Sequence, residues 1–150
     1  MDESLTPTTQ LVLVWTPGKG SPIHDHGNAH CLMKVLRGAL TETRYDFPSP
    51  FESGPMRIKS EREHKENAVA YMADELGVHR VSNQGSDFAV SLHRKLTPVP
   101  SRRRPCPDRV VSVYTPPNVA RSGCHIFDVK TGRKSHINSC GYYSVNGQRI

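Results

Sequence analysis

Short apolar runs separated by turn residues dominate the chain, and no segment shows an apolar stripe with helical spacing. Leu11–Trp15, Cys31–Leu36 and Ala68–Met72 are compact apolar runs typical of buried strands. His79–Asn83 and Phe88–His93 are further short strands with turn residues on either side. Because many short strands with frequent turns are typical of sandwiches and small barrels, this pattern predicts an all-β fold with few or no helices.

More polar segments complete the predicted sheet. Ala39–Phe47 follows a turn at Arg37–Gly38 and has the composition of a partly exposed strand. Residues 59–67 are highly charged, which allows either a solvated loop or an edge strand. Near the end of the chain, residues 125–137 have the pattern of a hairpin that turns at Thr131–Gly132.

The length and composition limit the class of protein. A chain of 150 residues is large enough for one core, so we expect a single domain over residues 1–150. Met1–Gln10 is polar and does not resemble a signal peptide, and no apolar run approaches the length of a membrane span. The four cysteines form no C-x-x-C pair. We therefore expect a cytoplasmic, monomeric protein without disulfides or a membrane partner.

The net charge of +6 comes mostly from one segment, residues 94–113. This segment holds six Arg and Lys against one Asp, whereas the remainder has 14 basic and 13 acidic residues. It also contains four of the twelve prolines, which is typical of a disordered, solvated insertion. Nucleic-acid binding needs a basic face combined with stacking or base-reading groups, so we expect no nucleic-acid partner.

A dense group of histidines indicates a metal site. His24 and His26 are separated by one residue, so on a strand both imidazoles point to the same face and can bind one ion. His79 is the best candidate for a third ligand because it begins a strand well downstream, after Gly77–Val78. Three nitrogen ligands leave coordination positions open, which is typical of catalytic sites and not of structural ones.

The spacing around these histidines resembles a known family. The order Gly18, five residues, His24-x-His26, four residues, Cys31, six residues and Gly38 is similar to the first motif of the cupins, with Cys31 in place of the usual glutamate. Together with "LGVHRVSN", "AVSLH" and "YTPP", it resembles the eukaryotic-type cysteine dioxygenases. The resemblance extends from about Leu11 to at least Thr131–Gly132, apart from the insertion. It implies an antiparallel, jelly-roll-like cupin barrel.

The resemblance also implies an activity and a metal. One Fe(2+) per chain is bound by His24, His26 and His79, and L-cysteine is oxidised with O2 to cysteine sulfinic acid, on the route to taurine. A different small thiol, such as a mercaptocarboxylic acid, is an alternative substrate. The alternative outside enzymes is an inactive, truncated cupin that binds metal or serves as an interaction module. Family members carry an N-terminal Tyr and Arg that bind the substrate carboxylate, whereas this chain offers only Lys19 before His24.

Further site residues follow from the same resemblance. Cys31 matches a cysteine that forms a thioether with a tyrosine, here Tyr114, and Ser91 and His93 match the residues that orient this tyrosine. His30 matches a histidine of the substrate pocket. In the family one residue separates the matching His and Tyr, whereas residues 94–113 separate His93 from Tyr114 here. The insertion is either a translated, unspliced intron or a surface-loop insertion.

Overall fold

The computed structural model describes residues 9–49, 53–96, 123–137, 144–145 and 148–149. Two antiparallel sheets and one small hairpin make up this part of the chain. The strands in chain order are β1 (Thr9–Trp15), β2 (Ile23–His24), β3 (His30–Arg37), β4 (Ala39–Tyr45), β5 (Ile58–Lys65), β6 (Val69–Met72), β7 (Val78–Ser82), β8 (Ala89–Leu96), β9 (Cys124–Phe127), β10 (Lys134–Ile137), β11 (Ser144–Val145) and β12 (Gln148–Arg149).

The prediction of an all-β fold is confirmed. Within the described ranges there is no α-helix, and the single 3-10 turn η1 (Asp74–Leu76) precedes β7. None of the helical structure described is long or apolar enough to cross a membrane. The structure also decides between the two alternatives for residues 59–67, because β5 is the edge strand of the larger sheet.

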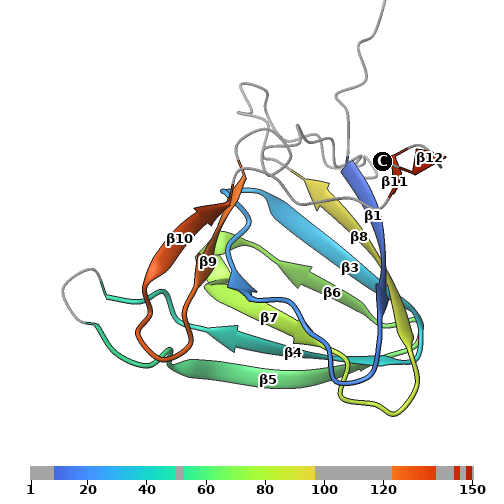
Figure 1. The fold of residues 1–150 in the computed structure, drawn as a ribbon, viewed down its shortest axis with the longest axis horizontal. Helices are drawn as coiled ribbons and strands as arrows, with labels where there is room; N and C mark the ends of the chain where they lie inside the picture. The colour runs from blue at the N-terminus through green and yellow to red at the C-terminus, as the bar shows by residue number, and fades with distance from the viewer. Residues whose placement is uncertain (1–8, 50–52, 97–122, 138–143, 146–147, 150) are drawn as a thin grey trace, which may run out of the picture.

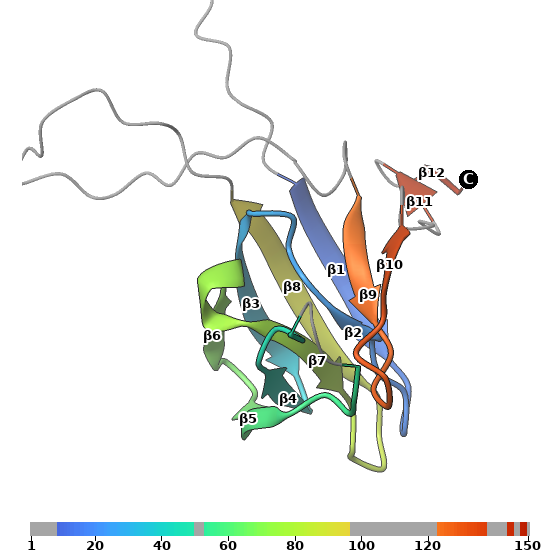
Figure 2. The same ribbon diagram turned by 90° about the vertical axis from the view of Figure 1, so that its left-hand side faces the viewer.

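The two sheets face each other, as Figures 1 and 2 show from two directions. The four-stranded sheet has the order β1-β8-β3-β6, and the six-stranded sheet has the order β10-β9-β2-β7-β4-β5. Gly38 alone separates β3 in the first sheet from β4 in the second, and its φ of 75° is a left-handed conformation that favours glycine. The chain therefore changes sheet at this sharp corner.

Side chains from the inner faces of both sheets form the core. One cluster joins Met33 and Val35 of the smaller sheet to Leu40 and Val81 of the larger sheet, with Trp15 packed against it. This arrangement follows from the strand alternation, because β3 has buried and exposed positions in turn along most of its length. A second cluster lies nearer the β9–β10 hairpin and consists of Ile23, Tyr45, Met56, Val78 and Phe127.

One strand differs in extent from the sequence expectation. The strand expected to end at His93 continues to Leu96, because position 94 pairs with both β1 and β3. The first three positions of the basic insertion therefore belong to β8. Residues 97–122, which include the remainder of the insertion and Tyr114, lie outside the described residues, so the expectation of disorder is not tested. The β9–β10 hairpin turns at Thr131–Gly132, as expected.

Candidate metal centre

Three histidines converge on one point of the six-stranded sheet. His24 ends β2 and is the direct cross-strand partner of His79 on β7, and His26 lies just beyond β2. One ligand atom from each of the three imidazoles lies within 4.8 Å of the other two. The ring centroids are 4.7 to 5.2 Å apart. The sequence expected His24 and His26 on one strand, whereas β2 ends at His24 and a turn positions His26.

Hydrogen bonds fix the orientation of two of these rings. A carbonyl oxygen can only accept, so His24 donates from Nδ1 to the Pro22 carbonyl at 3.1 Å. His79 likewise donates from Nδ1 to a carboxylate oxygen of Glu42 at 2.8 Å. Each of these imidazoles is thereby held with the Nε2 lone pair as the ligand atom. Three neutral imidazole nitrogens suit iron, zinc, copper or nickel, so the donor set fits a transition metal.

Glu42 is the charged centre behind the histidine cluster. It is 3% exposed and accepts hydrogen bonds from His79, from His64 at 3.1 Å and from Arg44 at 3.1 Å. Burial raises the pKa of Glu42, but its hydrogen bonds and electrostatic interactions with His79 and Arg44 outweigh this effect and lower it from 4.5 to about 2. Glu42 is therefore ionised at neutral pH and holds His79 in its ligand tautomer.

A second carboxylate positions the turn that carries His26. Both oxygens of Asp74 accept backbone N–H groups, from His26 at 2.8 Å and from Asn28 at 2.6 Å. Asp74 is the first residue of η1, and Gly77 follows its last residue. A Cβ atom at Gly77 would lie 2.2 Å from the carbonyl oxygen of Tyr45, so only glycine allows β7 to start this close to β4. The same short segment thus anchors His26 and begins the strand of His79.

Asp25, which lies between His24 and His26, connects this region to β9. Its carboxylate accepts the backbone N–H and the Nδ1–H of His125, both at 2.8 Å. The backbone N–H of Asp25 donates in return to the carbonyl of His125 at 3.1 Å. The histidine loop is therefore held from two sides, by Asp74 and by His125.

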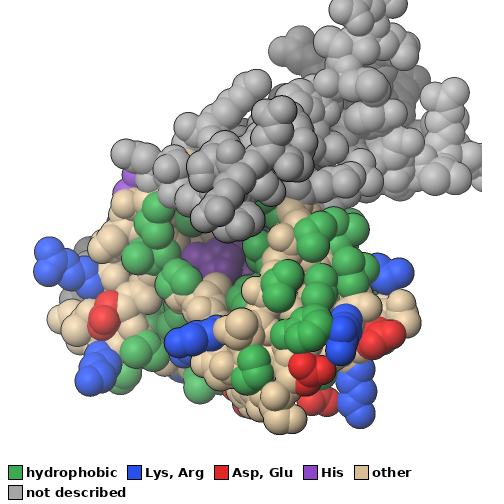
Figure 3. Space-filling view, turned by 45° about the vertical axis from the view of Figure 1, so that its right-hand side comes forward, with side chains coloured by type: hydrophobic (Ala, Val, Ile, Leu, Met, Phe, Trp, Pro, Cys, Tyr) green, Lys and Arg blue, Asp and Glu red, His purple; other side chains and the backbone are tan. Residues whose placement is uncertain are grey.

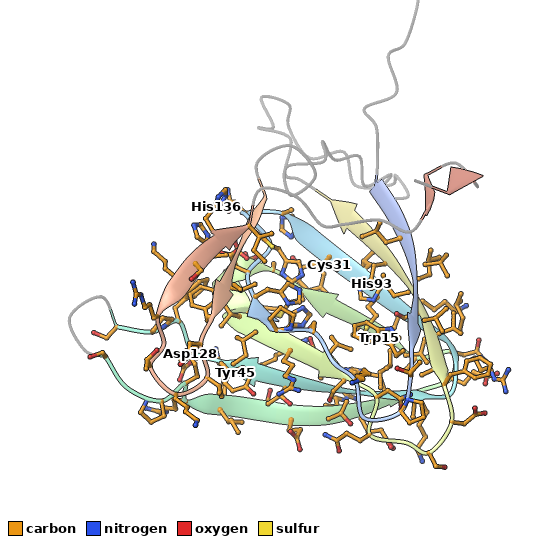
Figure 4. The ribbon with its side chains drawn as sticks, in the orientation of Figure 1. Trp15, Cys31, Tyr45, His93, Asp128 and His136 are labelled. Atoms are coloured by element: carbon orange, nitrogen blue, oxygen red, sulfur yellow. The ribbon has the colours of Figure 1, made fainter. Side chains whose placement is uncertain are left out.

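A row of polar side chains lies on the opposite, four-stranded sheet. Cys31 on β3 and Ser91 and His93 on β8 are all buried. Ser91 Oγ is 2.8 Å from His93 Nε2, and His93 Nδ1 is 3.9 Å from Cys31 Sγ. The indole N–H of Trp15 on β1 donates to Ser91 Oγ at 2.8 Å. Figure 4 shows Cys31, His93 and Trp15 one after another along this sheet.

His30 lies next to this row at the start of β3. Its Nδ1 shares a hydrogen bond with the hydroxyl of Tyr71, and the two rings stack with centroids 5.7 Å apart. Burial and the negative charge of Glu75 raise the pKa of Tyr71, so the phenol stays protonated at neutral pH. The space-filling view shows histidine atoms in a hollow of the surface, with apolar side chains around it (Figure 3).

The structure adds site residues that the sequence reasoning did not identify. Glu42, Asp74 and Trp15 contact the predicted residues from strands and turns far away in the chain. For Glu42, the sequence carried a weak signal, because a charged residue at an inward position of a predicted strand needs a buried partner. Among the residues predicted for the site, only Tyr114 lies outside the described part of the chain.

The two facing antiparallel sheets with an open three-histidine cluster define a cupin-type, double-stranded β-helix protein. A family model described as "Cysteine dioxygenase type I" matches residues 6–105. The chain belongs to the cysteine dioxygenase type I family.

Two curated relatives agree with this assignment. "Cysteine dioxygenase type 1" of Rattus norvegicus is 39% identical over 85% of this chain and 52% of its own length. The Danio rerio protein of the same name is 33% identical over 99% of this chain and 63% of its own length. Among solved structures, an RmlC-like cupin from Methanocaldococcus jannaschii matches with a TM-score of 0.45 and 19% identity, over 59% of this chain and 68% of the other. The chain spans about half the length of the mammalian relative.

Proposed function

We propose that the protein is an iron(II) thiol dioxygenase that oxidises L-cysteine with O2 to cysteine sulfinic acid. The observation that carries this proposal is the convergence of three histidine ligand atoms within 4.8 Å, in a group to which the described residues add no carboxylate, in a chain of this family. Mononuclear iron sites usually combine two histidines with one carboxylate. A site with histidines alone has room for an anionic thiolate from the substrate, which supplies the missing negative ligand.

The chain's own residues have distinct tasks in this reaction. His24, His26 and His79 would hold the iron, which would supply redox chemistry between a thiolate and O2. Glu42 keeps His79 in its ligand tautomer. In the overall reaction the thiol gains both atoms of O2 and becomes the sulfinic acid, so no external reductant is needed.

The four-stranded sheet supplies the second half of the proposed site. Cys31 and Tyr114 form a thioether in which the S–H and one ring C–H are lost and O2 accepts the two hydrogens. Ser91 and His93 orient the phenol of Tyr114, and His30 lines the substrate pocket. The short distances along Ser91, His93 and Cys31 support this assignment.

The test measures iron content, oxygen uptake and product with the same preparation. The full chain is loaded anaerobically with Fe(2+) and then mixed with air-saturated buffer containing L-cysteine, mercaptopropionate or no thiol. We expect one iron per chain, oxygen uptake that depends on cysteine, and cysteine sulfinic acid detected by mass spectrometry. The variant His79→Gln should lose iron and activity, whereas His136→Gln, a change at an exposed position of β10, should keep both.

Other outcomes of this experiment would indicate other functions. Stoichiometric iron without oxygen uptake indicates an inactive metal-binding cupin, and absence of iron binding indicates an interaction module. Oxygen uptake with mercaptopropionate alone indicates another thiol dioxygenase. We further propose that the protein is a cytoplasmic monomer, which cell fractionation and light scattering on the purified chain test.

A further inference from the structure

Trp15, which the sequence reasoning assigned no role, donates to the row of polar residues on the four-stranded sheet. Its indole N–H lies 2.8 Å from Ser91 Oγ, and the Ser91 hydroxyl lies 2.8 Å from His93 Nε2. We propose that Trp15 is a positioning residue that forces His93 into the Nδ1–H tautomer, with this N–H directed towards Cys31. The effect of this tautomer on catalysis rests on the proposed function, whereas the tautomer itself does not.

The hydroxyl proton of Ser91 determines the direction of the hydrogen bond between Ser91 and His93. Ser91 is 0% exposed, so its O–H needs a partner inside the protein. An indole N–H is a donor only, and Trp15 therefore cannot receive this proton. Within the described part of the chain, the remaining hydrogen-bond partner of the Ser91 side chain is His93 Nε2. The Ser91 hydroxyl must donate to it.

The direction of this bond determines the state of the imidazole. A nitrogen that accepts a hydrogen bond carries no proton, so the proton of neutral His93 lies on Nδ1. Nδ1 is the atom 3.9 Å from Cys31 Sγ. His93 consequently presents a donor, and not a lone pair, on the side of Cys31. A hydroxyl group placed beside Nδ1 would accept a hydrogen bond from this N–H. Its own proton would then be available for a hydrogen bond to another group, as a phenol needs in order to donate to a substrate.

Trp15 is itself held in place by a buried amide. Asn83 is 2% exposed, and its side-chain NH2 donates to the carbonyl oxygens of Trp15 and Asp87, both at 2.8 Å. The indole also packs against the main core cluster, and its ring centroid is 6.3 Å from that of His93. Trp15, which is held at both its backbone and its ring, thus sets the direction of the hydrogen bond between Ser91 and His93.

The experiment uses the fact that the chain contains one tryptophan. Biosynthetic incorporation of benzothienylalanine replaces only Trp15 and puts sulfur in place of the indole N–H without a change of ring shape. The full chain is labelled with nitrogen-15 at histidine and loaded with Zn(2+) as a diamagnetic probe. Long-range proton–nitrogen correlation spectra at pH 8 then report which nitrogen of each histidine carries the proton, and the His93→Gln variant identifies the His93 signals.

We expect only the Nδ1–H tautomer of His93 in the parent chain and a mixture of both tautomers in the sulfur-containing chain. Ser91→Ala should release the tautomer in the same way, and Trp15→Phe provides a genetically encoded comparison. An Nε2–H signal in the parent chain overturns the proposal, and so does a pure Nδ1–H signal after the indole N–H has been removed.

Activity measurements separate this proposal from the proposed function. If the chain oxidises cysteine, loss of the indole N–H should lower kcat with little change in KM, since Trp15 acts through His93 and not on the substrate. If the chain is inactive, the tautomer result still decides the role of Trp15, because the spectra need neither iron nor turnover.

Discussion

Replacing residues 94–113 with a single leucine should speed the formation of the proposed link between Cys31 and Tyr114. In the shortened chain, Tyr114 follows His93 after one residue and takes the register position of Lys95. That position is the direct cross-strand partner of Cys31, because β3 and β8 pair with Cys31 opposite residue 95. Side chains alternate along a strand, so the tyrosine also shares the inner face with the buried His93.

The distances and the chain entropy give the size of the effect. Directly opposite residues of antiparallel strands have Cβ atoms about 4.5–5.5 Å apart, within reach of a cysteine sulfur and a tyrosine ring. With the insertion present, closing a connection of twenty residues costs about 3 kcal/mol of chain entropy beyond a constant term. This corresponds to a rate of thioether formation about a hundredfold lower in the parent chain.

Intact-mass analysis measures the link directly. Both chains are loaded with Fe(2+), exposed to cysteine and air, denatured, and examined for the loss of two hydrogen atoms. The shortened chain should lose them within the turnover period, whereas Cys31→Ser in the same background should not. Equal rates in the parent and shortened chains would refute the register argument, as would a shortened chain that folds and binds iron but never forms the link.

Three further predictions concern the supports of the site. Glu42→Gln removes the charge that orients His79 and should weaken metal binding about ten- to hundredfold, measured by competition with a chelator. The control Glu63→Gln changes an exposed glutamate and should have no effect. Equal metal affinities in the Glu42→Gln variant and the parent chain would contradict the role of Glu42. Asp74→Asn leaves one of two backbone N–H groups without its acceptor and should lower the free energy of unfolding by about 1–3 kcal/mol in urea, so an unchanged midpoint would count against it. Hydrogen bonds from Thr131 lower the pKa of Asp128, so the midpoint of its NMR titration should lie below the ordinary value of about 3.9. The ionised carboxylate should stabilise the hairpin fully above the ordinary pKa. This stabilisation should fade as the pH falls through the lowered pKa. A midpoint at or above the ordinary value would exclude this.

The strands were predictable from sequence because each has a local apolar pattern. β1, β3, β4, β6, β7 and β8 lie where alternation or compact apolar runs indicated them. β2 was not predicted as a separate strand, since a two-residue strand has no period and exists only through its pairing with β7 and β9. η1 was missed for a similar reason. Its acidic residues at 74 and 75 give no apolar signal, and its role comes from the N–H groups that Asp74 accepts.

The sequence indicated the three clustered histidines but not the residues that support them. His24, His26 and Cys31 stand in one short motif, and the resemblance of its spacing to the cupin motif indicated a common site. Glu42 and Trp15 reach that site across the sheets, and nothing near them in the chain marks the contact. The continuation of β8 to Leu96 was also not predictable, because the pairing of position 94 with two neighbouring strands overrides the Pro-rich composition that follows.

The arrangement of the two sheets separates the candidate metal centre from the other proposed site residues. His24 and His79, with Glu42 behind them, belong to strands of the six-stranded sheet, and Asp74 fixes the loop of His26 from the turn that begins one of those strands. Cys31, His93 and Trp15 belong to the four-stranded sheet. An insertion after position 93 alters a strand of the four-stranded sheet and leaves the three proposed metal ligands and their supports in place. The parent and shortened chains should therefore bind iron with equal affinity and differ only in thioether formation and turnover, and a difference in iron affinity would show that the two halves are coupled.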